Sequence, residues 1–146
     1  MAALAPAVAV AVVLAACGGG DDSEQFRKDY NAAVERLSKV NTQIGQATGG
    51  AAAQSNQRIA KEFSRIADTA ERTRKKLSTL DPPDDAKDEY DQLLSSLERG
   101  IHDLRDVADA ARHNNVKAAG EAVRSLAKSG QRITAAEDAL RQAVDG

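Results

Sequence analysis

Apolar side chains recur at alternating spacings of three and four residues through most of this 146-residue chain. An α-helix completes a turn in 3.6 residues, so this spacing places them on one helix face. The pattern runs through four segments, from Phe26 to Ala47, Ile59 to Leu80, Tyr90 to Ala111 and Val116 to Val144. The strict alternation typical of strands is absent, and Ala, Glu, Lys, Arg and Gln dominate the polar positions. The sequence therefore predicts four amphipathic helices.

The predicted core consists of the apolar stripes of these four segments. The first three contain Phe26, Tyr30, Ala33, Leu37, Val40, Ile44 and Ala47; Ile59, Phe63, Ile66, Ala70, Thr73, Leu77 and Leu80; and Tyr90, Leu93, Leu94, Leu97, Ile101, Leu104, Val107, Ala108 and Ala111. The fourth contains Val116, Ala119, Val123, Leu126, Gly130, Ile133, Leu140 and Val144. Because many of these residues are small, we expect the helices to approach closely, above all at Gly130.

Three groups of turn-forming residues divide the segments: Gly49 and Gly50, the stretch 81–85, and the stretch 113–115. At the central break, Asp81 is expected to cap the third helix. Pro82 would then occupy the first helical position, where a missing N–H costs nothing. The expected helices cover residues 24–47, 51–80, 82–112 and 115–144.

Helices of this kind, joined by short connections, can bury their stripes only against one another. The predicted fold is therefore an all-α, antiparallel up-down four-helix bundle over residues 24–146, with a long coiled-coil hairpin that dimerises as the alternative. Residues 51–80 carry seven basic and three acidic side chains, whereas 81–113 carry four basic and ten acidic ones. This opposite charge favours pairing of the second and third helices, although exposed ion pairs contribute only ~0.2–1 kcal/mol each.

The first 16 residues differ in composition from the rest of the chain. Residues 2–16 carry no charged and no polar side chain, and the run is shorter than the ~20 residues of a membrane-spanning helix. A run of this length is typical of the core of a secretory signal peptide. It closes on Leu14, Ala15 and Ala16, followed by the single cysteine of the chain, Cys17. This junction resembles the lipobox of bacterial lipoproteins.

The resemblance implies that residues 1–16 are a signal peptide cut off before Cys17. It also implies a diacylglyceryl group on the Cys17 sulfur and acylation, for example with palmitate, of the new amino terminus. Such chains would anchor the protein to a bacterial membrane outside the cytoplasm, and stable anchoring needs two or more of them. Residues 17–23, which include three consecutive glycines, would form a flexible tether. The alternative for Cys17 is a small buried residue at the end of an alanine-rich helix.

A second resemblance concerns the central break. Leu77, Leu80, Pro82 and Pro83 form an L-x-x-L-x-P-P turn similar to that of uncharacterised helical lipoproteins of GC-rich bacteria. It implies a fold and a location in the cell, but no activity.

No set of residues in the sequence predicts catalysis. Glu98, His102 and Asp106 are spaced four apart, and a solvated helix face accounts for them. His102 and His113 lie eleven residues apart, about three turns, so one helix cannot bring both to one ion. His102 is expected at the surface, and His113 is expected to stabilise a helix C-terminus. We therefore expect no enzymatic activity, no cofactor and no metal site.

A basic run near the end of the second helix is a candidate membrane contact. It comprises Arg72, Arg74, Lys75 and Lys76. If Cys17 is anchored, the first helix leaves the membrane and the second returns to it. Basic side chains near anionic headgroups contribute ~1 kcal/mol each. The alternative is a solvated cluster that complements the negative end of its own helix.

Two functions remain open at this level. Twenty basic against twenty-two acidic residues, with only four aromatic ones, argue against nucleic-acid binding. The first hypothesis is a binding or scaffold module that presents a helix face, or its turns around Gly50 and Asn114, to an envelope protein or polymer. The alternative is a carrier of a small molecule or metal, with a pocket where Ala70, Thr73, Ala108 and Gly130 leave room between helices.

Overall fold

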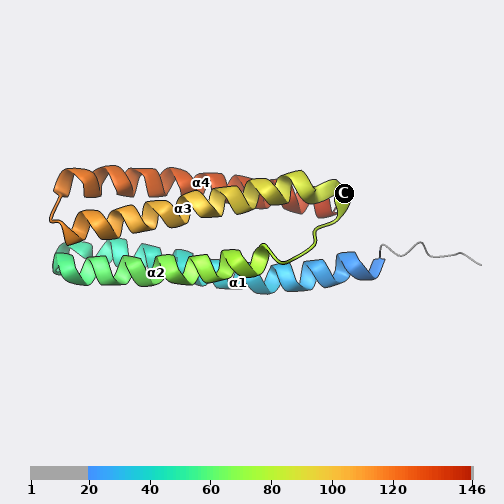
Figure 1. The fold of residues 1–146 in the computed structure, drawn as a ribbon, viewed down its shortest axis with the longest axis horizontal. Coiled ribbons are helices and arrows are strands. Elements are labelled where there is room, and N and C mark those ends of the chain that lie inside the picture. The colour runs from blue at the N-terminus through green and yellow to red at the C-terminus, as the bar shows by residue number, and fades with distance from the viewer. Residues whose placement is uncertain (1–19, 146) are drawn as a thin grey trace, which may run out of the picture.

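A computed structural model describes residues 20–145 as a bundle of long helices that alternate in direction (Figure 1). The four helices are α1 (Gly20–Gly50), α2 (Asn56–Leu77), α3 (Lys87–Arg112) and α4 (Val116–Asp145). Two short 3-10 helices, η1 (Ala51–Ala53) and η2 (Asp84–Ala86), stand in the connections. The described residues contain no strand. The predicted all-α four-helix bundle is confirmed.

The two ends of the bundle differ. We call the end that carries η1 and the α3–α4 connection the turn end, and the end where α1 begins the N-terminal end (Figure 1). Close backbone approach joins α1 to α2, α2 to α3 and α3 to α4. By contrast, α1 and α4 approach each other less closely, and side chains of the core close the seam between them.

The predicted stripes of the first three helices are confirmed. Most of their residues are buried, in one cluster toward the turn end around Phe63 and Ile101 and another toward the N-terminal end around Phe26 and Leu93. Burial of this apolar face is what stabilises helices of such length against one another.

The predicted stripe of the fourth helix is wrong in its first half. Val116 is 84% exposed and Val123 is 38% exposed, and Gly130 also lies at the surface. The face that α4 buries contains Ala122, Ser129, Ala136 and Leu140. In this orientation two serines of α4 bind a buried carboxylate of α3, as described below. Such polar contacts leave no trace in a pattern of apolar residues.

The glycine at a close helix approach is Gly100, and not Gly130. A Cβ at Gly100 would lie 3.1 Å from Ile133 Cδ1 of α4, whereas a Cβ at Gly130 would meet no atom within 4 Å apart from its own helix backbone. We therefore expect Gly130→Ala to raise the free energy of unfolding by about 0.5–1 kcal/mol, the helix-propensity difference between the two residues. Gly100→Ala should gain less, because Ile133 must shift. Denaturant titration of both variants measures this, and a destabilised Gly130→Ala variant would contradict the exposed position.

The first two helix boundaries differ from the prediction. Helix α1 begins at Gly20 and includes residues 20–23 of the predicted tether, because glycine costs far less at a helix start than in its interior. The helix continues through Gly50, so the glycine pair does not end it at residue 47. Helix α2 begins at Asn56 rather than 51, after Ser55, whose Oγ accepts a hydrogen bond from the N–H of Arg58 at 3.4 Å. The predicted signal peptide and Cys17 lie outside the described residues.

The central connection also corrects the prediction. Helix α2 ends at Leu77 and α3 begins at Lys87, after η2, so Asp81 and Pro82 do not start the third helix. The reason is the second proline, since the residue before a proline is excluded from helical geometry, and Pro82 precedes Pro83. Helix α4 runs from Val116 to Asp145, so its start and its end each lie within one residue of the predicted 115–144.

Candidate functional site

The α3–α4 connection shapes the turn end. Asn114 has φ 52°, a left-handed conformation that asparagine tolerates better than most residues. The N–H of Asn115 donates to the Ala110 carbonyl at 2.9 Å, which closes the helix C-terminus in a Schellman-type turn. The Asn115 side chain then accepts from the N–H of Ala118 at 3.0 Å and caps α4. Residues 113–115 thus end α3 and start α4 in the opposite direction.

Two further contacts hold this turn in place. His113 Nδ1 lies 2.8 Å from the carbonyl oxygen of Asp109 in the last turn of α3, so this histidine stands at the helix C-terminus as predicted, and its stabilising effect stays a prediction. Asn56 Nδ2 donates to Asn114 Oδ1 at 2.6 Å and links the start of α2 to the α3–α4 connection. The two connections at the turn end are therefore fixed to each other.

A hollow of about 240 Å³ lies at the turn end and is lined by residues of all four helices; we call it the apolar hollow. It is lined by Thr48, Ala51, Asn56, Ile59, Phe63, Val107, Ala110, Ala111, Asn114, Asn115, Val116, Ala119 and Val123. None of these side chains is charged. Several of the polar ones already have partners: Thr48 Oγ1 donates to the Ile44 carbonyl at 2.8 Å, and Asn56 and Asn114 bind each other. The apolar hollow therefore has an accessible surface that is mostly apolar.

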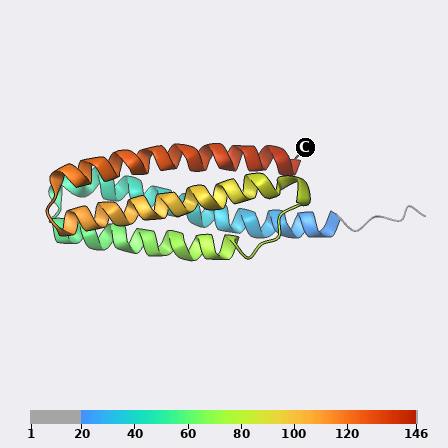
Figure 2. The same ribbon diagram turned by 45° about the horizontal axis from the view of Figure 1, so that its top comes forward.

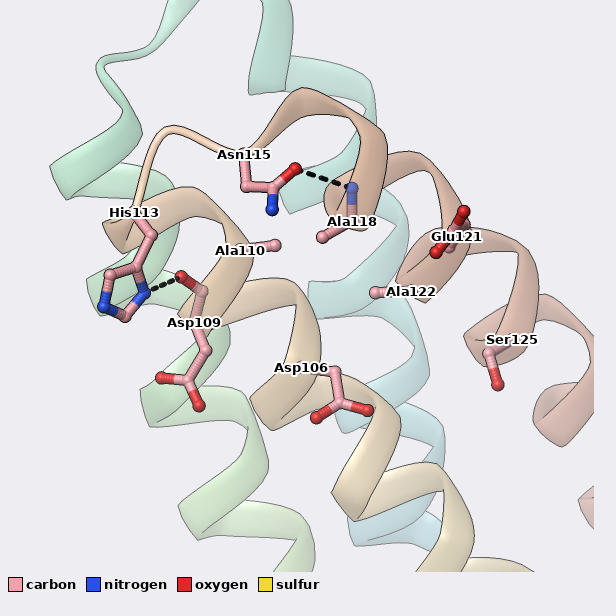
Figure 3. Close-up of a pocket in the computed structure, with 9 residues that line it drawn as sticks. All are labelled: Asp106, Asp109, Ala110, His113, Asn115, Ala118, Glu121, Ala122 and Ser125. Carbon is pink, nitrogen blue, oxygen red and sulfur yellow. Dashed lines mark hydrogen bonds between the residues drawn. The ribbon is translucent and has the colours of Figure 1, made fainter.

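A second hollow, of about 480 Å³, lies on the other flank of α4, in the groove between α3 and α4 (Figure 3). We call it the acidic groove. Its lining comprises Asp106, Asp109, Ala110, His113, Asn115, Ala118, Glu121, Ala122 and Ser125. Alanines form part of its wall, and the carboxylates come from both helices. One of them, Asp109, is paired with Arg112, so the groove is less negative than its three acids suggest.

Below the acidic groove, a buried carboxylate joins α3 to α4. Asp103 is 8% exposed and accepts hydrogen bonds from Ser125 Oγ at 2.8 Å and Ser129 Oγ at 2.6 Å. A charged group can be buried in this way only if hydrogen bonds replace its hydration. The sequence analysis missed this network. The available signal was the pair of serines four residues apart, which share one face of the fourth helix.

Removing this carboxylate should destabilise the bundle. We expect Asp103→Ala to lower the free energy of unfolding by about 1–3 kcal/mol, because the buried Ser129 hydroxyl then loses its partner and the contact of Asp103 with the more exposed Ser125 is lost as well. Further replacement of Ser125 and Ser129 by alanine should cost less in the Asp103→Ala background than in the wild type. Denaturant titrations of the single, double and triple variants measure this coupling. Strictly additive losses would show that the three groups do not act together.

The predicted row of Glu98, His102 and Asp106 is divided in the structure. His102 Nδ1 lies 3.1 Å from Asp106 Oδ2 at the exposed surface, whereas Glu98 turns to Arg74 of α2. Ligand atoms of His102, Asp103 and Asp106 lie within 4.8 Å of one another and could reach a single ion. Each of the three, however, already has a partner within the protein. The absence of a metal site therefore stays a prediction.

Two of the four basic side chains in the run of α2 are paired with acidic side chains. Arg74 Nη2 lies 2.8 Å from Glu98 Oε2 and ties α2 to α3, as their opposite charges predict. Lys75 Nζ lies 3.6 Å from Glu71 Oε1, and Arg72 donates to Thr69 Oγ1 at 3.0 Å. The contact of Arg72, Arg74, Lys75 and Lys76 with a membrane stays a prediction.

Aromatic rings pack at the N-terminal end. Phe26 stacks on Tyr30 at 5.7 Å between ring centroids and meets Tyr90 edge-on at 5.4 Å. Tyr90 donates its hydroxyl to the Leu77 carbonyl at 2.5 Å, which ties the start of α3 to the end of α2. Burial raises the pKa of Tyr30 to about 12, with a further contribution from the charge of Glu137, whose own pKa is raised by burial. The three rings thus pack together at this end.

The small residues proposed to leave room for a ligand do not line either hollow. Ala70, Thr73 and Ala108 are buried against neighbouring helices, and Gly130 faces solvent.

Among residues 20–145, no helix has an apolar stretch long enough to cross a membrane. Comparisons with protein families, with curated proteins and with solved structures found no match to this chain.

Proposed function

We propose that this protein is an extracytoplasmic lipoprotein, anchored to a bacterial membrane through Cys17, whose helical bundle acts as a binding or scaffold module in the cell envelope. One observation supports it best: α1 begins at Gly20, three residues after Cys17, at the opposite end of the bundle from the α3–α4 connection (Figure 2). The residues that line both hollows lie at or toward the turn end. Acyl chains at Cys17 would therefore hold the N-terminal end at the bilayer and direct the turn end away from it.

The turn end has the surface expected of a binding module. Val116 and Val123 extend the apolar hollow onto the outside of α4, with 84% and 38% of their surface exposed. Single exposed apolar residues are common on proteins, but exposed apolar residues that adjoin a hollow are typical of interaction sites. The hydrogen bonds around Asn114 tie the connections at the turn end to each other, and a surface that is ordered before binding loses less entropy on binding.

The intact mass of the protein purified from membranes tests the anchor. The expected mass is that of residues 17–146 plus a diacylglyceryl group, with or without a third acyl chain. A chain that still carries residues 1–16 and an unmodified thiol would contradict the proposal.

Co-purification from detergent-solubilised envelope tests the binding function. The wild-type chain should recover one definite partner, and Val116→Asp should lose it because a charge then sits at the rim of the apolar hollow. Glu121→Gln, on the other flank of the same helix, is the matched control and should keep the partner. Preparations that contain only lipid would count against a binding module.

The apolar hollow also favours a second candidate function, a carrier of a small apolar molecule. Its volume of about 240 Å³ lies below the ~300–1,000 Å³ of typical ligand pockets, so only a compact molecule would fit. A true ligand must raise the melting temperature by mass action. Thermal shifts with small apolar compounds, compared between wild type and a variant that fills the hollow, Ala119→Leu, would distinguish this function from protein binding.

A further inference from the structure

We propose that the last turns of α1, together with η1, form a lid that opens by local unfolding while the rest of the bundle stays folded. The lid consists of residues 41–54. Two of its residues, Thr48 and Ala51, line the apolar hollow together with Phe63 of α2 and Val107 of α3. Opening removes Thr48 and Ala51 from the wall of the hollow, so the lid controls access to it. This motion requires neither the anchor at Cys17 nor a binding partner.

Little buried surface holds the lid closed. Within residues 41–50, the end of α1, the one buried side chain is that of Ala47, and Ile44 is partly buried. The last ten residues of α3, 103–112, stand at the same end of the bundle and provide a comparison (Figure 1). They bury Asp103, Leu104, Val107, Ala108, Ala110 and Ala111. Because packing of an apolar face supplies most of the stability of a helix in a protein, α1 is much less stabilised here than α3.

Polar contacts do not compensate for this small burial. Within the lid, no side chain forms a hydrogen bond or an ion pair with another helix, and residues 41–54 carry no charge. The hydroxyls of Thr42 and Thr48 donate to carbonyl groups of α1 itself, four residues back, which weakens a helix slightly. The last turn of α1 also lacks the basic side chains that complement the negative ends of α2 and α3.

The glycines of the lid favour its opening. A Cβ at Gly45 or Gly49 would meet no atom within 4 Å apart from its chain neighbours and its own helix backbone, and no glycine among the described residues has a positive φ. Neither packing nor backbone geometry therefore requires glycine at these two positions. Glycine gives the unfolded segment more conformational freedom than alanine does. The two glycines thus favour the open form without improving the closed one.

The residues on either side of the lid are fixed. Before it, Val40 is 5% exposed and packs in the turn-end cluster. After it, Ser55 caps α2, and Asn56 is bonded to Asn114 at 2.6 Å. Gln54, the last residue of the lid, has an extended backbone with φ −112° and ψ 153°, so the helical geometry is already interrupted there. The lid can therefore open without disturbing α2 or the α3–α4 connection.

Hydrogen exchange of the full-length chain, followed by mass spectrometry of its peptides, tests the lid. The amides of residues 41–53 should exchange at least about tenfold faster than those of 103–112, because local opening needs less free energy than unfolding of the bundle. Gly45→Ala should slow the exchange of the lid about two- to fivefold, since alanine stabilises the closed helix. The measurement is made where closing of the lid is faster than chemical exchange.

Gly130→Ala is the matched control, because it makes the same replacement at another exposed helix position where a Cβ meets no neighbour. It stabilises the whole bundle but not the closed lid relative to the open one, so exchange of the lid should stay unchanged. If Gly130→Ala slows the lid as much as Gly45→Ala does, the lid exchanges only when the bundle unfolds and the proposal is overturned. Lid amides that exchange no faster than those of 103–112, or that Gly45→Ala does not slow, overturn it as well.

Discussion

Cys17→Ser is expected to move the protein from the membrane fraction to the soluble fraction. The serine oxygen cannot carry the thioether-linked diacylglyceryl group that the lipobox resemblance implies. Each buried methylene contributes ~0.8 kcal/mol, so two long acyl chains account for effectively complete membrane retention. Cell fractionation followed by immunoblotting measures the change.

Gly19→Ser is the matched control, because it adds the same hydroxyl two residues away and leaves the thiol in place. This variant should remain in the membrane fraction with the mass of the lipidated chain. If Cys17→Ser remains there as fully as the control does, the anchor is not at this cysteine.

Phe63→Ala is expected to cost about 3–5 kcal/mol in the free energy of unfolding, the usual loss for a buried aromatic ring. Phe63 is 2% exposed, packs in the turn-end cluster and also lines the apolar hollow. The space that its ring leaves would merge with the hollow and could not collapse easily. Because the free energy of unfolding of a domain of this size is only ~5–15 kcal/mol, the variant should lose a large part of it. Urea titration followed by circular dichroism measures the loss.

Val123→Ala serves as the comparison for Phe63→Ala. It lines the same hollow but is 38% exposed, so its truncation removes little buried surface. We expect a loss of less than about 1 kcal/mol. Equal losses for the two variants would show that the ring of Phe63 does not occupy the core.

Periodicity predicted the fold because it depends on which residues share a helix face, and three of the four stripes follow that rule. It failed on α4, where the buried face includes Ser129 and the exposed one includes Val116. In the observed orientation, Ser125 and Ser129 bond to Asp103, a residue of another helix, through hydrogen bonds that exist only in the folded chain. No count of apolar residues along α4 contains that information.

The boundaries show a similar division between local and tertiary causes. The steric effect of Pro83 on Pro82 is local and could have been predicted, and it moves the start of the third helix to Lys87. Neither hollow could be predicted, because each depends on the distance at which α4 stands from its neighbours. The role of His113 was predictable, since a histidine near the end of a helix stabilises its carbonyl groups.

The start of α1 at Gly20 gives the molecule a fixed reach. Two residues, Gly18 and Gly19, separate Cys17 from this helix, and the three steps of chain from Cys17 to Gly20 can span at most about 10 Å. The 31 residues of α1 then rise by about 45 Å. If Cys17 is anchored as proposed and the bundle stands upright, the bundle acts as a molecular ruler. The turn end then contacts only those components of the envelope that lie at one distance from the bilayer, set by the length of the bundle.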